Sequence, residues 1–279
     1  MVDEKYSVLM SVYTKENPDY FKTCIESIVN QSLIPEEIVI VKDGPITLEL
    51  DKIINYYELN YDGLFTVVEL KENVGLGKAL NEGLKQCRNE LVARMDTDDI
   101  SLANRCELQV GEFVKDKNLD IVGSNIDEFY DTPDKVVSSR VVPLEHDEIL
   151  KFSRRRSPFN HPTVMYKKTS VLSNGGYGDF RRNQDLDLFV RMLNNGCKAK
   201  NINRSLLLFR ANKDNVKRRK SWDKCRSYIF MIYSFWRKGY SSFIDLTVIA
   251  FSQIFIFISP TWVLEWISGK YLRKTYKRR

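Results

Sequence analysis

Three carboxylates occupy four positions in the segment ARMDTDDIS, residues 93–101, directly after a short apolar run. They belong to Asp96, Asp98 and Asp99. Carboxylates held this close raise one another's pKa, so a nearby cation would stabilise them. Mg²⁺ and Mn²⁺ prefer carboxylate oxygen, and Mg²⁺ usually takes one or two carboxylates together with substrate phosphates. The segment therefore indicates a divalent-cation site, although a solvated loop that caps the next helix could use the same residues.

Two further segments place polar residues beside glycine. Asp43 stands in VKDGP after an apolar run, where an Asp-Gly-Pro turn would form without any function. Lys78, in VGLGKALNEGL, is expected in the first turn of a helix, where it could face a phosphate. The spacing is not that of a Walker A loop, because Glu72 stands where the first glycine is required, and Leu80 breaks the GxGxxG pattern. A plain glycine loop entering a helix is the alternative.

The segment NQDLDLF places Asp185 and Asp187 in the first turn of a helix predicted over residues 183–196. Acidic residues there are favoured by the helix dipole without any function. Because they are two positions apart they point to different faces, so at most one should reach a pocket. His161, in NHPT, is more often structural than catalytic in such a setting.

Short β-branched runs alternate with helical stretches in the first part of the chain. Near-continuous apolar strands that alternate with helices predict an α/β fold, with a parallel sheet covered on both faces. In such sheets ligands bind at the carboxyl ends of the strands, where the polar loops described above fall. A strand pair within 125–143 and a short strand within 161–168 are expected further along. The expected strands of the first part are 6–13, 37–42, 64–70 and 90–95, and the expected helices are 18–31, 47–57, 77–87 and 102–115.

Composition excludes several classes of protein. The chain has 279 residues, 43% of them hydrophobic and 29% charged, as in a globular protein. Five cysteines without a CxxC pair argue against a zinc ribbon or a disulfide framework, and two histidines are too few for a multi-histidine zinc site. The first residues, MVDEKYSVLMSVY, lack the basic start of a signal peptide. We therefore expect a reduced, cytosolic protein.

The end of the chain is basic and partly apolar. Residues 211–279 hold 15 Lys or Arg and 4 Asp or Glu, a net charge of +11, so residues 1–210 carry −5 of the total of +6. Such a tail suits an anionic surface, either nucleic acid or phospholipid. The uncharged run 246–264 has 19 residues, enough to span a membrane, although a buried core helix is the alternative.

Three features of this run argue against a simple span. Pro260 would interrupt the helix, and Ser252 and Gln253 lie near its middle. Both flanks are rich in Lys and Arg, which places both on the same side of a membrane. We expect a membrane-surface or re-entrant pair of helices that binds anionic lipid, rather than nucleic acid. The interfacial anchors would be Trp262, Trp266, Tyr271 and Tyr276.

The order of these motifs over about residues 5–210 resembles glycosyltransferase family 2. The strand-end Asp comes first, followed by the glycine-rich loop, the DTDD segment, the His-Pro strand and the acidic pair that opens a helix. The resemblance implies a GT-A fold with a Rossmann-like mixed sheet flanked by helices, and an inverting, metal-dependent transfer. The part from HPTVMYKK to FRANKDNVKRRKSW is closest to bacterial transferases of capsule and exopolysaccharide assembly. Lys42 and Gln184 depart from the family's usual acidic residues.

The resemblance also assigns roles to residues. A nucleotide-sugar, with UDP as the expected nucleotide, would be the donor, Mn²⁺ or Mg²⁺ the cofactor, and a lipid-linked saccharide the acceptor. The resemblance makes 1–210 the catalytic domain. From its charge and its apolar run, 211–279 is expected to be a basic, amphipathic helical region at the cytoplasmic face of the bacterial inner membrane. The implied site residues are Asp185 as catalytic base, Asp98 and Asp99 at the metal, Tyr13, Glu16, Asp43, Lys78 and Asp96 at the donor, and His161, Gln184, Asp187, Arg218 and Arg219 around the acceptor pocket.

Two other readings stay open. A sugar-phosphate nucleotidyltransferase also uses an α/β nucleotide domain and Mg²⁺, but SVLMSVYTKENP lacks its glycine-rich phosphate loop. A membrane-docked scaffold for a polysaccharide assembly complex would need no catalytic residues. The sequence leaves the sugar, the linkage and the oligomeric state undetermined.

Overall fold

The computed structural model describes residues 4–211, 221–260, 263 and 274–275. Its first half is a parallel sheet in the order β4-β1-β2-β3, in which neighbouring strands keep an unbroken register. Residues alternate along each strand, so that Val8 and Met10 of β1 face one core and Leu9 faces the other. The four strands are β1 (Tyr6–Val12), β2 (Glu37–Lys42), β3 (Phe65–Glu69) and β4 (Leu91–Arg94).

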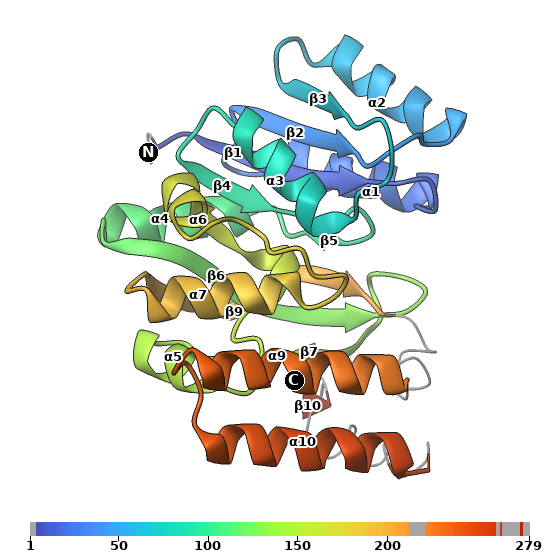
Figure 1. The fold of residues 1–279 in the computed structure, drawn as a ribbon. Coiled ribbons are helices and arrows are strands. Elements are labelled where there is room, and N and C mark those ends of the chain that lie inside the picture. Colours follow the sequence, from blue (N-terminus) through green and yellow to red (C-terminus); the bar gives the residue numbers. More distant parts are fainter. Residues whose placement is uncertain (1–3, 212–220, 261–262, 264–273, 276–279) are drawn as a thin grey trace.

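Helices cover both faces of this half, as the apolar strands predict. Helices α1 (Pro18–Val29) and α2 (Leu48–Asn60) pack on one core, and α3 (Leu76–Gln86) packs on the other (Figure 1). Gly83 of α3 lies so close to β1 and β2 that an added Cβ would stand 2.5 Å from Leu9 and Val41 side-chain atoms. The glycine thus permits close packing of α3 on the sheet.

The second half adds antiparallel strands, which makes the sheet mixed. Strand β8 (Met165–Lys167) pairs antiparallel with β4, and β6 (Leu119–Phe129) pairs antiparallel with β8 and parallel with β9 (Lys198–Arg210). The predicted strand pair within 125–143 is confirmed as β6 with β7 (Val136–Arg140). The remaining short strands are β5 (Ile100–Ser101), which pairs with β9, and β10 (Lys274–Thr275), which pairs with β7.

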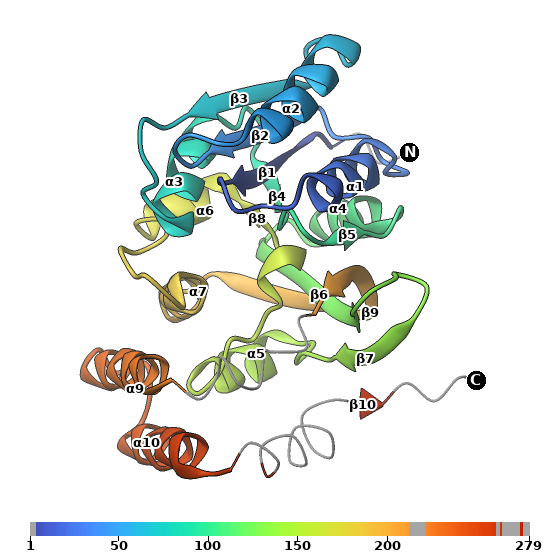
Figure 2. The ribbon, with the colours of Figure 1, turned by 90° about the vertical axis from the view of Figure 1, so that its right-hand side faces the viewer.

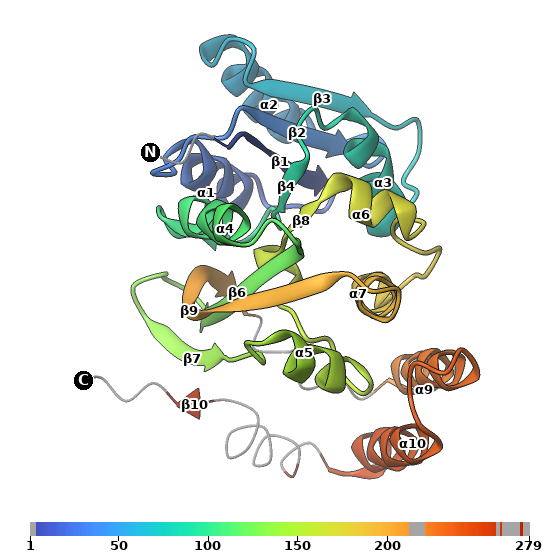
Figure 3. The same cartoon turned by 90° about the vertical axis from the view of Figure 1, so that its left-hand side faces the viewer.

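Three views place the helices of the second half. Helix α7 (Gln184–Asn194) lies between α3 and α9 (Trp222–Arg237), and α10 (Phe243–Ile258) is the outermost of this stack (Figures 1, 2 and 3). Leu186 and Val190 of α7 share an apolar cluster with the α9 side chains. The other helices are α4 (Arg105–Lys115), α5 (His146–Ser153) and α6 (Lys168–Ser173), with a 3₁₀ turn at His161–Thr163.

The sequence prediction misses β9, α5 and α6, and it ends α2 three residues early. Helix α10 has 16 residues, starts three residues before the apolar run 246–264 and ends at Ile258, two residues before Pro260, so it contains residues 246–258 of that run. Within the described residues, no helix is both long and apolar enough to cross a membrane. The proposed anchors Trp262, Trp266, Tyr271 and Tyr276 lie outside the described residues.

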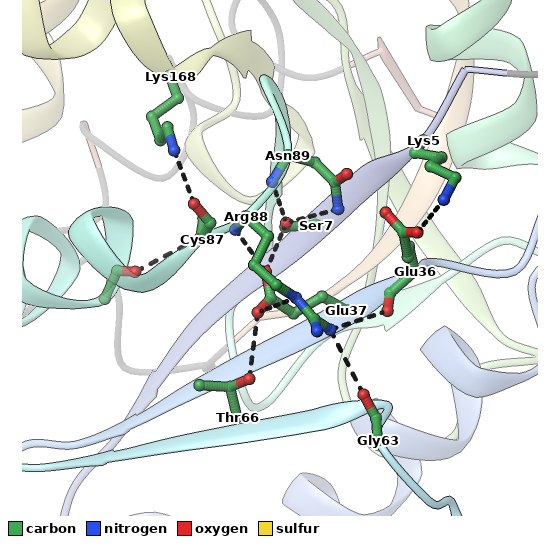
Figure 4. Close-up of polar contacts among 11 residues, drawn as sticks. Lys5, Ser7, Glu36, Glu37, Gly63, Thr66, Cys87, Arg88, Asn89 and Lys168 are labelled. Atoms are coloured by element: carbon green, nitrogen blue, oxygen red, sulfur yellow. Dashed lines mark hydrogen bonds and ion pairs between the residues drawn. The ribbon is translucent and has the colours of Figure 1, made fainter.

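The buried carboxylate of Glu37 forms hydrogen bonds to neighbouring strands at the edge of the sheet opposite their carboxyl ends (Figure 4). Glu37, at the start of β2, accepts hydrogen bonds from Ser7 Oγ at 2.8 Å, Thr66 Oγ1 at 3.1 Å and the Arg88 backbone N–H at 2.8 Å. Its carboxylate also pairs with Arg88 Nε at 3.0 Å. These bonds join β1, β2, β3 and the segment before β4, and they lie away from the polar loops.

Candidate active site

The polar loops that the sequence singles out follow strands of one parallel sheet, so they meet at one edge. Tyr13 and Glu16 follow β1, Asp43 follows β2, and the acidic loop follows β4. Tyr13 is exposed, and its carbonyl accepts a hydrogen bond from the Glu16 N–H at 3.1 Å. The sheet topology thus gathers the residues that the sequence predicts for the donor.

Asp43 holds the glycine-rich loop in place. Its buried carboxylate accepts hydrogen bonds from the backbone N–H groups of Val74 at 2.7 Å and Gly75 at 3.1 Å. Gly44 has a positive φ of 80°, and a Cβ there would stand 2.6 Å from the Asn73 nitrogen. The turn after β2 and the loop before α3 are therefore one packed unit.

The start of α3 lies against the segment that leads into α7. An added Cβ on Gly77 would touch the Gln184 side chain at 3.3 Å. Asn81 bonds the Tyr177 backbone at both its N–H and its carbonyl, each at 2.8 Å. Lys78 is exposed and pairs with Asp179 at 2.9 Å. The glycine-rich loop and the acidic pair of α7, about 100 positions apart in sequence, are thus brought to the same edge.

Two arginines hold the acidic loop after β4, one at each end of the loop. Arg94, which is almost fully buried, forms an ion pair with Asp96. Asp99 is fully buried, and its Oδ1 accepts a hydrogen bond from the Arg210 N–H at 2.9 Å. Arg210 Nε donates to the Asp98 carbonyl at 3.0 Å. The Asp98 side chain is half-buried, and Asp99 Oδ2 is buried with no hydrogen-bond partner among the described residues.

Negative charge accumulates around this loop. Burial, and then the charge of the nearby Asp96, raise the pKa of Asp98. Burial, and then the charges of Asp96 and Asp98, raise the pKa of Asp99 well above its usual value. Burial and the Asp98 charge raise the pKa of Glu16 to about 7. The loop after β1 and the loop after β4 therefore face each other, and the positive charge of Arg94 only partly offsets the repulsion among their carboxylates.

This arrangement fits a divalent cation that shares its ligands with a substrate. Within the described part of the chain, no three His, Cys, Asp or Glu side chains are grouped as a complete metal site. Mg²⁺ often needs only one or two protein carboxylates when phosphate oxygens supply other ligands. The unpartnered oxygen of Asp99 and the crowded carboxylate of Asp98 are the groups that such a cation would satisfy.

Asp185 and Asp187 have different surroundings at the start of α7. Burial raises the pKa of Asp185, while the Leu186 N–H and the Arg94 charge oppose that rise. Asp187 is buried and pairs with Arg191, at 2.6 Å from Nη2 and 2.8 Å from Nε. Asp187 is thus already neutralised within its own helix, whereas Asp185 forms no such ion pair with any residue that the structure describes.

The sequence patterns do not predict one buried polar cluster, which consists of Arg94, His161 and Tyr177. His161 Nε2 lies 3.0 Å from the Tyr177 hydroxyl, and burial together with the Arg94 charge holds the pKa of His161 well below its usual value. Burial raises the pKa of Tyr177 to about 12, with Arg94 opposing the rise. Arg94 Nε and Nη1 are buried without a hydrogen-bond partner among the described residues. The only sequence signal is an arginine inside an apolar run.

Of the other residues predicted for the acceptor pocket, two lie near Asp185. Gln184 directly precedes Asp185 and lies beside α3. His161 is affected by the charge of Arg94, which also acts on Asp185. Arg218 and Arg219 lie outside the described residues. Asp187 points its carboxylate toward Arg191 and toward Gly178, where an added Cβ would be 2.8 Å from Oδ2.

Comparisons with known sequences identify relatives over most of the chain. Residues 7–176 match the profile of "Glycosyl transferase family 2". A protein of Escherichia coli named UDP-Gal:alpha-D-GlcNAc-diphosphoundecaprenol beta-1,3-galactosyltransferase is 37% identical over 97% of both chains. The amylovoran biosynthesis glycosyltransferase AmsE of Erwinia amylovora is also 37% identical, over 80% of this chain and 83% of its own.

Solved structures share the fold at lower identity. S. aureus TarS with bound UDP-GlcNAc has a TM-score of 0.62 and 17% identity, over 96% of this chain and 76% of that chain. The mannosyltransferase PcManGT from Pyrobaculum calidifontis, with GDP-Man and Mn²⁺, has a TM-score of 0.64 and 15% identity, over the same shares of the two chains. These likenesses establish the mixed α/β fold of GT-A type.

Proposed function

The chain belongs to glycosyltransferase family 2, and on that premise we propose that it transfers a sugar, with inversion, from a UDP-sugar to a hydroxyl group of a lipid-linked saccharide. The reaction would serve bacterial surface polysaccharide synthesis, the field named for several relatives. One observation carries the proposal most directly. The carboxylates of the β4 loop and of the α7 start interact with the same buried Arg94, so donor-binding and proton-accepting groups would share one site.

The donor would lie across the carboxyl ends of β1, β2 and β4. Tyr13 and Glu16 would contact the nucleotide, Asp43 the base and Asp96 the ribose, and Lys78 at the start of α3 would face a phosphate. The name of the 37% identical relative supports UDP as the nucleotide. The bonds from Asp43 to Val74 and Gly75 support its place in the donor site, because they fix the loop beside it.

Asp98 and Asp99 would hold Mn²⁺ or Mg²⁺. A bound divalent cation would stabilise the negative charge that develops on the diphosphate leaving group. The crowding of Asp96, Asp98 and Glu16 supports this assignment, because a cation would relieve their mutual repulsion.

Asp185 would act as the general base. In this reaction the acceptor oxygen forms a bond to the anomeric carbon while the bond from that carbon to the diphosphate oxygen breaks. The acceptor hydroxyl transfers its proton to the Asp185 carboxylate, and the single displacement inverts the anomeric centre. Burial makes Asp185 a better proton acceptor by raising its pKa toward neutrality, which is the range in which general bases are most effective.

The same relative and the C-terminal helices support proposals for the acceptor and the location. The relative's name gives it a diphosphoundecaprenol-linked acceptor, and we extend that class of acceptor to this chain. Residues 1–210 would form the catalytic domain, and 211–279 would associate with the cytoplasmic face of the membrane through basic and apolar side chains. The exposed apolar side chains of α10 support this division.

The first test is a panel of nucleotide-sugars with and without Mn²⁺, read by thermal stabilisation, because a ligand that binds the native state raises its melting temperature. We expect UDP-sugars to stabilise the protein only with the cation, and one of them to be transferred to a prenyl-diphosphate-linked sugar. Release of diphosphate from a nucleoside triphosphate and a sugar phosphate would instead identify a nucleotidyltransferase. Absence of both ligand binding and turnover would identify a scaffold.

A further inference from the structure

A basic loop lies next to the C-terminal helix pair and has no part in the donor site. Arg154, Arg155 and Arg156 follow α5, and all three are exposed. Arg155 forms an ion pair with the buried Asp245 in the first turn of α10. Within the described residues, the guanidinium groups of Arg154 and Arg156 have no carboxylate partner, and that of Arg156 lies 5.4 Å from the Phe152 ring centre. Two arginines are thus available for an anion.

The loop is held by the helices rather than extended into solvent. The Tyr228 hydroxyl of α9 donates a hydrogen bond to the Arg155 carbonyl at 2.7 Å. Ser241 Oγ, between α9 and α10, donates to the Arg154 carbonyl at 2.9 Å. The loop, the end of α5 and the first turn of α10 line an open cavity of about 660 Å³. The two free guanidinium groups therefore stand on a fixed backbone at the rim of a cavity.

An apolar surface begins at the same cavity. Ile244 lines the cavity and is 66% exposed, and Phe251, two turns further along α10, is 74% exposed. From Ile244 to Ile258 this surface extends for about 21 Å along the helix. Isolated exposed apolar residues are common, but a continuous stripe marks a surface that meets an apolar partner. The exposed members of this α10 stripe are Ile244, Val248, Phe251, Ile254, Phe255 and Ile258.

The basic loop also lies close to the proposed base. Leu186, next to Asp185, packs in one apolar cluster with Met231 and Ile232 of α9, and Tyr228 packs against that cluster. Burial raises the pKa of Tyr228 to about 12, with the Arg156 charge opposing and the Asp185 charge reinforcing the rise. Tyr228 therefore lies near both Asp185 and Arg156.

We propose that Arg154 and Arg156 bind the diphosphate of a prenyl-diphosphate-linked acceptor, that its prenyl chain lies along the α10 stripe, and that its sugar reaches Asp185. The inference rests on the proposed function and adds to it the surface that recognises the acceptor. Charge complementarity favours this occupant, because guanidinium groups bind phosphate oxygens through paired N–H donors. In a prenyl diphosphate the anionic group is bonded directly to the apolar chain, just as the basic loop lies directly beside the apolar stripe of α10.

Binding of farnesyl diphosphate tests the surface without turnover. The donor site is first filled with UDP and Mn²⁺, and binding is then measured by calorimetry for farnesyl diphosphate, inorganic diphosphate and farnesol. We expect farnesyl diphosphate to bind more tightly than either part alone. The double variant R154Q/R156Q should weaken it about tenfold or more, since two charge-assisted contacts are lost. The control K85Q/K115Q removes the same charge from exposed lysines elsewhere and should leave it unchanged.

Other outcomes overturn the proposal. If inorganic diphosphate binds as tightly as farnesyl diphosphate, the α10 stripe takes no part. If the control variant weakens binding as much as R154Q/R156Q does, only net charge matters. If I244S/F251S lowers sedimentation with phosphatidylglycerol vesicles but leaves farnesyl diphosphate affinity unchanged, the stripe binds bilayer lipid rather than the acceptor chain.

Steady-state kinetics separate this inference from the proposed function. With a prenyl-diphosphate-linked sugar as acceptor, R154Q/R156Q should raise the acceptor KM about tenfold while kcat at saturating acceptor and the donor KM change little. An unchanged acceptor KM in the variant, with an active wild type, overturns the subsite alone. A wild type that transfers sugar to aryl glycosides but to no prenyl-diphosphate acceptor overturns the proposed acceptor class and the subsite with it.

Discussion

The Arg210 backbone N–H donates a hydrogen bond to the Asp99 carboxylate at 2.9 Å, which joins the acidic loop after β4 to the last residue of β9. Arg210 makes a second bond, from Nε to the Asp98 carbonyl at 3.0 Å, and its guanidinium lies 3.7 Å from the centre of the Tyr20 ring. The loop proposed to hold the cation thus takes its shape from a strand more than 100 positions away. Asp98 and Asp99 should consequently respond differently to substitution.

Asp98→Asn is expected to abolish transfer and weaken binding of the nucleotide-sugar in Mn²⁺, while the fold survives. Removal of one ligand charge from a cation at the diphosphate should cost several kcal/mol, roughly 3 or more, of transition-state stabilisation. Stopped assays of transfer and calorimetry of UDP with Mn²⁺ provide the measurement. Near-normal turnover would remove Asp98 from the metal site.

Asp99→Asn is expected to leave the metal-free protein as stable as the wild type or more stable near pH 7. The substitution keeps an oxygen that can accept the Arg210 N–H, and it removes a carboxyl group whose ionised form is disfavoured by burial and by the charges of Asp96 and Asp98. Urea unfolding with and without Mn²⁺ measures the effect. We expect Mn²⁺ with UDP to stabilise the variant less than the wild type, and an equal ligand effect in both proteins would mean that Asp99 only anchors Arg210.

Glu16 should make the metal-free protein less stable as pH rises. Its pKa is about 7 in the folded protein and near 4.5 when unfolded, so between these values the folded state binds more protons. The stability contributed by Glu16 is therefore full below pH 4.5, is lost as pH rises through about 7, and stays constant above it. In urea unfolding from pH 5 to 8, Glu16→Gln should reduce this fall. Parallel curves for the variant and the wild type would contradict the prediction.

Asp43→Ala is expected to lower both stability and donor affinity. Its carboxylate is buried and accepts the N–H groups of Val74 and Gly75, so the variant leaves two backbone donors unpaired, at about 1–3 kcal/mol. Because the glycine-rich loop moves with them, the KM for the donor should rise while the acceptor KM changes little. A loss of stability with unaltered UDP affinity, measured by calorimetry, would leave Asp43 as a turn former only.

Glu37→Gln offers a matched control at the other edge of the sheet. Its carboxylate accepts bonds from Ser7 and Thr66 and pairs with Arg88, so the variant should be less stable by about 1–3 kcal/mol. Because these contacts lie away from the polar loops, KM and kcat measured well below the melting temperature should stay unchanged. A change in donor KM comparable to that of Asp43→Ala would show that stability alone explains both variants.

Local pattern predicts the first half of this fold and much of its polar edge. The parallel strands are short apolar runs, and polar loop residues follow them. The sequence therefore predicts β2 and places Asp43 directly after its last residue. Strand β9 cannot be read in the same way. It starts with KAKNINRS, which has no apolar periodicity, and it is a strand because it pairs with β6 about 80 positions earlier, through several register shifts.

The site shows the same limit. Motif order predicts that the acidic loop and the start of α7 belong together, but not which groups lie between them. Arg94 occurs in an apolar run and Tyr177 in a turn, so their types and spacing resemble ordinary strand and loop residues. They become neighbours of Asp185 only because β4, β8 and α7 pack together, and the charge of Arg94 then influences Asp96, His161 and Asp185.

The two acidic residues of α7 give the last prediction. The sequence leaves Asp187 the minor role of favouring the helix dipole, whereas in the structure Asp187 is buried and bound to Arg191. Arg191 Nη2 also donates to the Gly176 carbonyl at 2.7 Å, so this pair fixes the segment that carries Tyr177. Asp187→Asn is therefore expected to cost stability, about 1–3 kcal/mol, with a modest loss of kcat.

Asp185→Asn should have the opposite profile. The amide cannot accept a proton, so kcat should fall by a factor on the order of 10² or more, while stability and the affinity for UDP with Mn²⁺ are retained. Because burial raises the pKa of Asp185, activity of the wild type should also decline as pH falls toward that pKa, and the residual activity of Asp185→Asn should lack this decline. Urea unfolding and pH profiles of kcat/KM for both variants decide between the residues. If Asp187→Asn loses the pH dependence and Asp185→Asn keeps it, Asp187 is the base, and its pairing with Arg191 must break when the acceptor binds.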